Sequence, residues 1–387
     1  MRSNIVRALG LLAAVALVVA VPAALASKPK PKHGVKGSTH TKKGKKPAKP
    51  TTKKADEGTQ HVFVIVLENH SAASVIGDPN APFISSLAAK YAVAKNYYGV
   101  THPSLPNYVA LLSGSNWWSN SDNPAQRFAH VNLVDQLEAA HKTWAGYMEA
   151  LPSDKLADSW PSSSNALYAS KHNPFVLFDD IRSSQARLAN VKPYTQLAAD
   201  LAKESTTPNF ALIVPDQCND MHGGVYTAVD GHPETPCPYG SANDDANDAS
   251  LKQKADAFVK GAVDTIMGST AWKSGHSVIF VVADEGDYNA TAATGGWAST
   301  DGCCDSPILP KGDPDISPDW PGGVYGGGLS PAVIVAPKGK TGGYTSTTPY
   351  NHYSLLSTIE QIFGLSKLAY AADTAQVTPM TEFLTKK

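Results

Sequence analysis

The chain has 387 residues, of which 42% are apolar and 17% are charged. This balance excludes an intrinsically disordered chain and supplies enough apolar material for one large folded domain or two smaller ones. The charge is uneven, because residues 1–55 hold 13 basic and no acidic residues, whereas the rest holds 20 basic against 34 acidic residues. Such an acidic body argues against nucleic acid as the main partner.

Residues 1–26 are typical of a secretory signal peptide. Arg2 and Arg7 precede an apolar stretch from Ala8 to Val21, and Ala24-Leu25-Ala26 fits the small-residue pattern of a cleavage site. The apolar stretch is shorter than the roughly 20 residues that a membrane-spanning helix needs, which favours export with cleavage over a retained anchor. We therefore predict a secreted protein that is extracellular or associated with the cell envelope.

Residues 27–57 form a Lys/Pro-rich segment with runs such as Lys28-Pro29-Lys30-Pro31-Lys32. Such a segment cannot bury apolar surface and its charges repel one another, so we predict an extended, disordered linker. The simplest role of this linker is that of a solvated spacer. The alternative is docking on an anionic cell-surface polymer or lipid, where each lysine near the surface adds about 1 kcal/mol.

Residues 58–387 are predicted to form the catalytic domain. Strands are expected where short apolar, β-rich runs occur, at His61–Leu67, Phe210–Val214, Ser277–Ala283 and Pro331–Ala336. Helices are expected where apolar residues recur with helical spacing, at Pro82–Tyr91, Pro106–Leu112, Leu133–His141, Ser250–Met267 and His352–Phe363, the last ending at Gly364. Continuous apolar strands that alternate with helices predict an α/β fold, with a mostly parallel central sheet and helices on both faces. Residues 286–330 lack periodicity and are expected to be a long loop or lid.

Polar residues follow three of the predicted strands. The clusters are Glu68-Asn69-His70, Pro215 to His222, and Asp284-Glu285-Gly286-Asp287. Ligands of open α/β sheets bind beyond the carboxyl ends of the strands, so parallel strands would gather these clusters at one edge. Carboxylate and amide oxygens favour a divalent Ca²⁺, Mg²⁺ or Mn²⁺ ion, with Zn²⁺ as a less favoured alternative. Each cluster taken alone is also compatible with simple capping of the next helix or turn.

Ser104, in the segment Thr101-His102-Pro103-Ser104-Leu105-Pro106-Asn107-Tyr108, is the candidate nucleophile. Pro106 suits the first turn of a helix, so Ser104 is expected just before the helix, where backbone N–H groups favour a phosphate or a developing oxyanion. The alternative is an ordinary N-cap serine. A metal ion beside Ser104 would lower the pKa of its hydroxyl. His222 and His352 are candidates for proton donation to the leaving group or for binding metal or phosphate, although a single histidine is more often structural.

The chain has four cysteines, Cys218, Cys237, Cys303 and Cys304. In an oxidising compartment they are expected to form two disulfides. Four cysteines allow three pairings, one of which joins the adjacent Cys303 and Cys304 in an eight-membered ring, and the sequence does not choose among them. A thiolate metal site is disfavoured because the chain has no C-x-x-C pair.

Several segments between about residues 60 and 370 resemble the bacterial phosphoesterase family of secreted acid phosphatases and phospholipases C, within the alkaline-phosphatase-like superfamily. They are Val66-Leu67-Glu68-Asn69-His70-Ser71, Ala81-Pro82-Phe83-Ile84, Thr101 to Tyr108, Asn219-Asp220-Met221-His222, Asp284-Glu285-Gly286-Asp287 and His352 to Leu365. The resemblance is strongest to the mycobacterial secreted acid phosphatases that act on phosphatidylinositol 3-phosphate. The Lys-rich linker and the length of the 286–330 region depart from the family pattern.

The resemblance implies a metal-dependent phosphomonoesterase that forms a covalent phosphoserine intermediate. It implies metal ligation by Glu68, Asn69, Asp284 and Glu285, and a nucleophilic Ser104, with Thr101 as the neighbouring hydroxyl. His222 and His352 match histidines of the family motifs. Asp220 and Glu149 are further metal or phosphate candidates. The implied substrate is a phosphate ester, including phospholipids such as phosphatidylinositol 3-phosphate.

The sequence also allows three alternative functions. A phospholipase C-like phosphodiesterase would use the same centre on a different ester. A metal-independent Ser-His-Asp acyl hydrolase is disfavoured because no G-x-S-x-G occurs in the chain. A non-catalytic Ca²⁺-stabilised surface module is disfavoured because the Asp-rich segments Asn243–Asp248 and Asp313–Asp319 do not fit an EF-hand loop.

Overall fold

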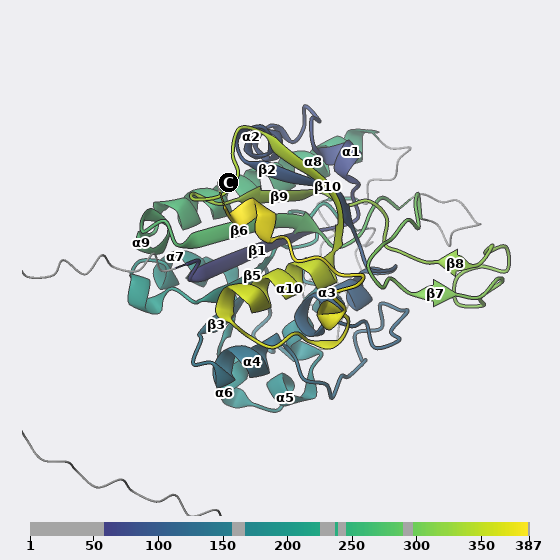
Figure 1. The fold of residues 1–387 in the computed structure, drawn as a ribbon, viewed down its shortest axis with the longest axis horizontal. Helices are drawn as coiled ribbons and strands as arrows, with labels where there is room; N and C mark the ends of the chain where they lie inside the picture. Colours follow the sequence, from purple (N-terminus) through teal and green to yellow (C-terminus); the bar gives the residue numbers. More distant parts are fainter. Residues whose placement is uncertain (1–57, 157–166, 225–236, 239–244, 289–296, 386–387) are drawn as a thin grey trace, which may run out of the picture. The chain divides into compact units, whose positions relative to one another are not determined.

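A computed structural model of the chain describes residues 58–156, 167–224, 237–238, 245–288 and 297–385 (Figure 1). The predicted signal peptide at 1–26 and Lys-rich linker at 27–57 lie outside the described residues. No helix in the described part of the chain is long and apolar enough to span a membrane.

The strands and helices alternate along much of the chain. The strands are β1 (His61–Leu67), β2 (Ala92–Tyr98), β3 (Trp144–Met148), β4 (Val191–Pro193), β5 (Phe210–Val214), β6 (Ser277–Ala283), β7 (Ile308–Leu309), β8 (Gly323–Val324), β9 (Ala332–Val335) and β10 (Tyr344–Asn351). The α-helices are α1 (Ala72–Val75), α2 (Pro82–Lys90), α3 (Ser104–Ser113), α4 (Leu133–Ala139), α5 (Asp179–Arg182), α6 (Gln185–Leu188), α7 (Leu197–Asp200), α8 (Asp245–Gly268), α9 (Thr270–Lys273) and α10 (His352–Phe363).

Eight of these strands form one sheet in the order β10-β2-β9-β6-β1-β5-β3-β4. Neighbouring strands are parallel except for β9, which runs antiparallel to both β2 and β6. The central pairs β1–β5 and β1–β6 are in continuous parallel register, with Val62 opposite Phe210 and Val278. The predicted α/β fold with a mostly parallel sheet is therefore confirmed.

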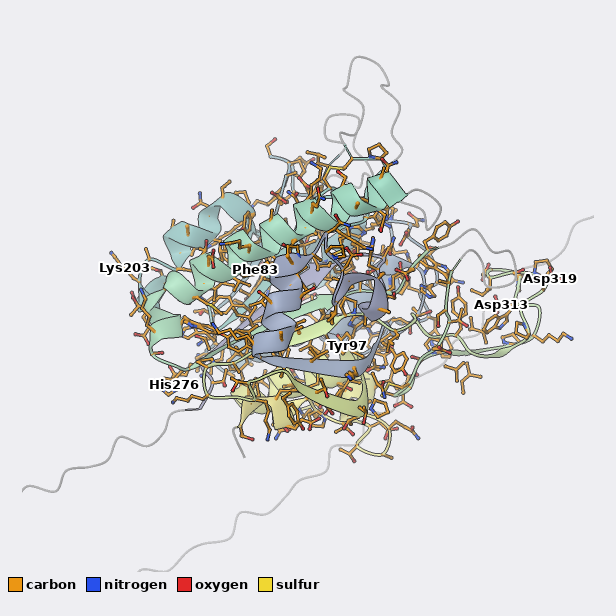
Figure 2. The ribbon with its side chains drawn as sticks, turned by 90° about the horizontal axis from the view of Figure 1, so that it is seen from above. Phe83, Tyr97, Lys203, His276, Asp313 and Asp319 are labelled. Atoms are coloured by element: carbon orange, nitrogen blue, oxygen red, sulfur yellow. A yellow bond between two sulfur atoms is a disulfide. The ribbon has the colours of Figure 1, made fainter. Side chains whose placement is uncertain are left out.

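The two faces of the sheet are covered by different helices, and β1 shows why. One set of its side chains (Val62, Val64, Val66) belongs to the apolar core that includes α3, α4 and α10. The alternate set (Phe63, Ile65, Leu67) belongs to a second core that includes α2 and α8. Figure 2 shows the long helix α8 on one side of the sheet and the yellow C-terminal part of the chain on the other. Burial on both faces explains why the central strands are uninterrupted apolar runs.

The predicted elements are present with small differences. Strands β1, β5 and β6 have their predicted bounds, whereas the predicted strand at Pro331–Ala336 is shortened to β9 and is antiparallel. Ser104, expected just before a helix, is the first residue of α3. Helix α10 ends at Gly364 as predicted, with a left-handed φ of 68° that glycine adopts without strain. Within the 286–330 region, β7 and β8 form a short hairpin beside the main sheet (Figure 1).

The two disulfides join Cys218 to Cys237 and Cys303 to Cys304. Of the three possible pairings, this is the one that joins the adjacent cysteines. The sequence alone did not choose among the three. The first disulfide fixes part of the loop after β5, and the second lies within the 286–330 region.

Glu360 on α10 is a buried carboxyl group that makes stability depend on pH. Its Oε1 accepts a hydrogen bond from the Leu368 N–H at 2.8 Å, and Lys367 Nζ lies 3.9 Å from its Oε2. Burial outweighs these favourable contacts and raises the pKa of Glu360 from 4.5 to about 8. The folded state therefore holds a proton between these pH values that the unfolded chain has released, so this group lowers stability as the pH rises.

We expect Glu360→Gln to stabilise the protein by on the order of 2 kcal/mol at pH 8 and to change little at pH 4.5, because glutamine stays neutral. Urea unfolding at both pH values measures the difference. The exposed Glu204→Gln serves as the control and should show no pH-dependent gain. Equal effects of Glu360→Gln at both pH values would contradict the expectation.

Candidate active site

The carboxyl ends of β1, β5 and β6 meet at one edge of the sheet because these strands are parallel neighbours. The Glu68 N–H donates to the Asp220 carbonyl oxygen at 2.7 Å, and the Asp284 N–H donates to the Leu67 carbonyl oxygen at 3.0 Å. These backbone bonds tie together the three polar segments that follow the strands. The structure thus brings Glu68, Asp220, Asp284 and Glu285 into one buried cluster.

Ser104 lies between two carboxylates of this cluster. Its hydroxyl is 3.0 Å from Glu68 Oε2 and 2.9 Å from Glu285 Oε1, so it can donate its proton to either. The preceding loop is fixed by Asn107, whose Oδ1 accepts hydrogen bonds from the N–H groups of Val100 and Thr101. The sequence motif therefore shapes the loop that presents Ser104 to the two carboxylates.

The N-terminus of α3 contributes less to this site than the sequence suggested. The Leu105 N–H already donates to Asp122 Oδ1 at 3.0 Å, and Pro106 has no N–H group. Positive charge beside Ser104 comes instead from Lys171, which lies in the short 3₁₀ turn Ser170–His172.

Lys171 is only 1% exposed, and its Nζ lies among three polar groups. It is 2.6 Å from Asp122 Oδ2, 3.4 Å from His222 Nε2 and 3.5 Å from Ser104 Oγ. Burial lowers the pKa of this amine, but Asp122 and Glu68 more than compensate and raise it, so Lys171 is charged. A buried ammonium group beside a serine hydroxyl is suited to hold a negatively charged oxygen.

His222 faces Lys171 from the loop after β5. Its Nδ1 donates to the Gly223 carbonyl oxygen at 2.7 Å, which leaves Nε2 to accept from Lys171. The segment is held by Asp220, whose Oδ1 accepts the His222 N–H at 2.7 Å. Burial, followed by the charge of Lys171, lowers the pKa of His222 to about 3, so the ring is neutral.

Glu68 is supported by two further side chains. The Tyr108 hydroxyl donates to its Oε1, and His172 Nε2 lies 3.3 Å from the same oxygen. The other ring nitrogen of His172 is 3.0 Å from Gln217 Nε2 and 3.5 Å from Asp220 Oδ2. This network orients the Glu68 carboxylate toward Ser104.

Burial disfavours the charged form of the carboxylates in the cluster. Burial and then the neighbouring acids raise the pKa of Glu68 and Glu285 well above the usual range. Burial also raises the pKa of Asp284 to about 7. A bound cation would offset this repulsion, because it neutralises several carboxylates at once.

The donor atoms of the cluster fit a divalent metal ion. Ligand atoms of Glu68, Asp284 and Glu285 lie within 4.8 Å of one another, and those of Glu68, His172 and His222 form a second such group. Asn69 Oδ1 and Asp284 Oδ2 are buried and accept no hydrogen bond from the described residues. Asn69 has a φ of 48°, in the left-handed region that asparagine adopts more readily than most residues with a side chain. Two unsatisfied oxygen acceptors beside clustered carboxylates are what a metal ion would complete.

These groups open into a cavity of about 320 Å³ whose lining includes Asn69, Ser104, Lys171 and His222. Trp297 forms part of its wall and stacks on His102, with ring centres 4.0 Å apart and planes at 8°. His102 Nδ1 is 2.5 Å from Glu285 Oε2, and its Nε2 is 2.9 Å from the Ser299 carbonyl oxygen. The 286–330 region is thus linked to the carboxylate cluster by two contacts: Trp297 packs on His102, and His102 contacts Glu285.

Three predicted site residues belong neither to the lining of this cavity nor to the carboxylate cluster behind it. Thr101 donates its hydroxyl to the His102 carbonyl oxygen at 3.2 Å and lines a separate cavity. Glu149 accepts hydrogen bonds from the Asp216 N–H and the Asn219 side chain, so it fixes the loop after β5. His352 lies behind the cluster, where Nδ1 accepts from the Tyr97 hydroxyl at 2.7 Å and Nε2 donates to the Asp284 carbonyl oxygen at 2.6 Å.

Sequence reasoning missed Lys171, His172, Asp122, Tyr108 and the contact role of His102. His102 and Tyr108 belong to the Thr101–Tyr108 motif, so their position beside Ser104 was available as a signal. Lys171 and Asp122 lie in stretches without periodicity, and only the tertiary structure shows that they belong to the site, where Lys171 Nζ lies 2.6 Å from Asp122 Oδ2.

Comparisons with known proteins find sequence relatives of this chain. The sequence profile of the Phosphoesterase family matches residues 78–235 and 237–366, well over half of the chain. Phosphatidylinositol-3-phosphatase of Mycobacterium tuberculosis is 28% identical over 319 residues, covering 82% of this chain and 81% of that protein. An acid phosphatase of Aspergillus fumigatus is 34% identical over 164 residues, covering 41% of this chain and 36% of that protein.

Among solved structures, a 2-O GAG sulfatase superposes with a TM-score of 0.50, covering 85% of this chain and 76% of its own at 12% identity. This likeness concerns the fold alone. The match of the family profile confirms what the sequence motifs indicated: the chain belongs to the phosphoesterase family and is a hydrolase of phosphoric ester bonds.

Proposed function

We propose that this chain is a metal-dependent phosphatase that hydrolyses phosphate monoesters, with Ser104 as the nucleophile. The observation that carries the proposal is the position of Ser104 Oγ, between the carboxylates of Glu68 and Glu285 and 3.5 Å from Lys171 Nζ. Such a centre combines acceptors for the serine proton with a cation for the phosphate oxygens.

In the proposed reaction, Ser104 Oγ attacks phosphorus as its proton passes to a carboxylate oxygen that it already faces. The bond from phosphorus to the ester oxygen breaks, and that oxygen takes a proton from the pair formed by Lys171 and His222. Water then gives a proton to the same pair and attacks phosphorus. The bond from phosphorus to Ser104 Oγ breaks, Oγ takes back its proton from the carboxylate, and phosphate is released. His352 and His102 act as positioning residues, because they bond to Asp284 and Glu285 and do not line the cavity.

The proposed metal ion would be held by Glu68, Asn69, Asp284 and Glu285. Asp220, which is buried in the same cluster, is a further candidate ligand. When bound, it would lower the pKa of the attacking hydroxyl and neutralise charge on the phosphoryl oxygens. The oxygen-rich donor set favours Ca²⁺, Mg²⁺ or Mn²⁺, and His172 and His222 also make Zn²⁺ compatible.

Lys171 favours monoesters over the alternative phosphodiester substrates. A phosphate monoester carries up to two negative charges on three terminal oxygens, whereas a diester carries one charge on two. A buried, charged amine beside the nucleophile stabilises the more highly charged monoester more than it stabilises the diester. The relative from Mycobacterium tuberculosis supports a phosphoinositide, such as phosphatidylinositol 3-phosphate, as one candidate substrate.

Export through residues 1–26 and docking of residues 27–57 on an anionic surface polymer or lipid complete this proposal. Both rest on the sequence patterns of the N-terminal residues, namely the apolar stretch with its small-residue site and the eleven lysines. A secreted enzyme tethered in this way would act on esters at or outside the cell surface.

The test is hydrolysis of p-nitrophenyl phosphate by the full chain before and after chelation. We expect chelation to reduce turnover at least about fiftyfold, and one of Ca²⁺, Mg²⁺, Mn²⁺ or Zn²⁺ to restore it. Bis-p-nitrophenyl phosphate is measured alongside and should be the poorer substrate. Full activity after verified removal of metal would overturn metal dependence, and preference for the diester would favour the phosphodiesterase.

A further inference from the structure

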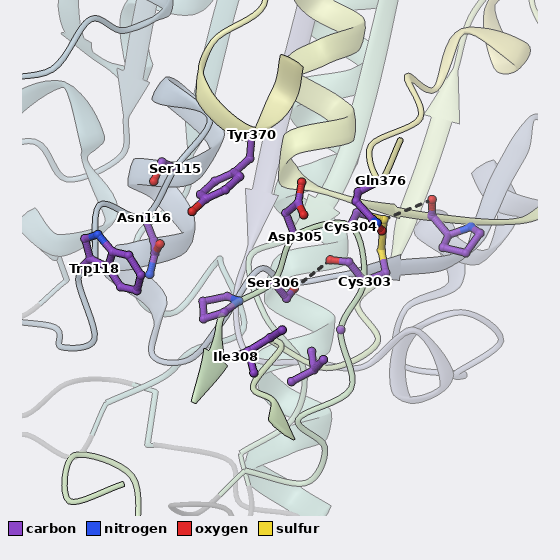
Figure 3. A pocket seen from close by; sticks show the side chains of 14 residues that line it. Ser115, Asn116, Trp118, Cys303, Cys304, Asp305, Ser306, Ile308, Tyr370 and Gln376 are labelled. Atoms are coloured by element: carbon purple, nitrogen blue, oxygen red, sulfur yellow. Dashed lines mark hydrogen bonds between the residues drawn. A yellow bond between two sulfur atoms is a disulfide. The ribbon is translucent and has the colours of Figure 1, made fainter. Parts of the chain in front are cut away.

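A second, larger cavity lies apart from the Ser104 cavity. It has a volume of about 710 Å³ and shares no lining residue with the Ser104 cavity. We call it the Trp118 pocket; the rings of Trp118 and Tyr370, the side chains of Asn116, Asp305 and Gln376, and the Cys303–Cys304 disulfide contribute to its lining. Figure 3 shows the two aromatic rings on one side of the pocket and the disulfide on the other.

The exposed apolar side chains of the described residues are concentrated at this pocket. Six large apolar side chains are exposed in the described part of the chain, and four of them line it: Trp118 at 84%, Ile308 at 76%, Val324 and Tyr370. Single exposed apolar residues are common, but several around one concave site mark a binding surface.

The backbone that presents these groups is strained on both sides of the pocket. Trp117 and Trp118 have φ values of 50° and 62°, and Cys304 and Asp305 have φ values of 58° and 70°. A left-handed φ is unfavourable for tryptophan and cysteine, so the surrounding structure must hold these residues in place. Trp117 shows how: its ring stacks on His130 with centres 3.5 Å apart, and its indole N–H donates to Ser113 Oγ at 2.9 Å. Trp118 is therefore turned outward by a fixed neighbour.

The charge of the pocket excludes an anionic ligand. Asp305 is the one charged residue among its described lining residues, and the carboxylate of Asp373 acts on it. Without a lysine or arginine, the pocket would repel phosphate groups and the surface of an anionic membrane. An acyl chain is also a poor fit, because it would remove the polar groups of Asp305 and Gln376 from water without replacing their hydrogen bonds.

We propose that the Trp118 pocket binds a neutral carbohydrate. A sugar ring offers both kinds of surface that the pocket requires: C–H faces that stack on Trp118 and Tyr370, and hydroxyl groups that bond to Asn116, Asp305 and Gln376. The rigid disulfide and Ile308 supply the opposite apolar wall, and the volume suits more than one sugar unit. The site would hold the enzyme on a neutral glycan while the separate Ser104 cavity stays open to its ester.

The test is calorimetric titration of the full chain with three neutral hexasaccharides: maltohexaose, mannohexaose and chitohexaose. We expect at least one to bind with a Kd below about 1 mM, and Trp118→Ala and Tyr370→Ala each to weaken binding at least about tenfold. Val131→Ala, which changes an exposed apolar side chain outside the pocket, is the matched control and should bind like the wild type. Hydrolysis of p-nitrophenyl phosphate should be unchanged in all three variants, and thermal melting verifies that each is folded.

Three results would overturn the proposal. One is no binding of any of the three sugars at about 5 mM, well above the expected Kd. Another is binding that the folded Trp118→Ala and Tyr370→Ala variants retain in full. The third is co-sedimentation with phosphatidylcholine vesicles that is lost in Trp118→Ala, which would assign the pocket to lipid. None of these measurements depends on phosphatase activity, so the failure of this proposal and that of the proposed function are distinguishable.

Discussion

Replacing Ser104 with alanine is expected to reduce turnover of p-nitrophenyl phosphate by about 10⁴-fold or more. The variant removes the only hydroxyl oxygen that faces both Glu68 and Glu285 among the described residues. Because the side chain is small and buried, alanine leaves the fold intact, and thermal melting should confirm this. Acid quenching with a ³²P-labelled monoester should trap a phosphoprotein in the wild type and none in Ser104→Ala.

The matched control is Thr101→Val, which removes the neighbouring hydroxyl while keeping its shape. Thr101 bonds to the His102 carbonyl oxygen and lines a different cavity, so we expect turnover within about threefold of the wild type. If Ser104→Ala keeps a tenth or more of the activity while Thr101→Val loses it, Thr101 is the nucleophile. If neither variant loses activity, a water molecule attacks directly.

Replacing Lys171 with methionine is expected to reduce kcat/KM for the monoester by about 10³-fold and that for the diester by only about tenfold. Methionine retains much of the length of lysine but removes the charge that lies 3.5 Å from Ser104 Oγ. The decrease in kcat/KM should therefore be larger for the substrate that carries more negative charge. The informative quantity is the ratio of monoester to diester activity, because a general loss of folding would lower both equally.

Lys252→Met is the matched control for this substitution. Lys252 is also a nearly buried lysine, with a side chain 5% exposed, and it pairs with Asp78 and Asp248 away from the Ser104 cavity. Its loss should lower stability without changing the activity ratio. In Lys171→Met the carboxylate of Asp122 loses its partner. The double variant Lys171→Met/Asp122→Asn removes that charge as well, so it should be more stable than Lys171→Met but no more active. An unchanged ratio in Lys171→Met would show that Lys171 is structural.

Two of the sequence expectations illustrate how far local patterns reach. The runs of β1, β5 and β6 are buried on both faces, so each is apolar throughout and its ends are visible in the sequence. Strand β10 was not predicted, because its sequence YTSTTPYN is polar, contains a proline and lies at the edge of the sheet. Strand β2 was also missed, because Lys95 and Asn96 interrupt its apolar run and its second half is only partly buried.

The sequence by itself determined the parallel core, the three polar segments that follow its strands and the serine motif at the start of α3. These features are local, and parallel strands necessarily place their carboxyl ends at one edge, so the cluster of Glu68, Asp284 and Glu285 follows from the order of elements. Only the tertiary structure decided the disulfide pairing, the separation of Thr101 from the Ser104 cavity, and the position of Lys171. Lys171 and Asp122 reach the site from segments without periodicity, through contacts between residues 49 to 67 positions apart. Such long-range packing leaves no repeating pattern in the chain, because its stabilisation comes from burial and charge pairing that exist only once the fold has formed.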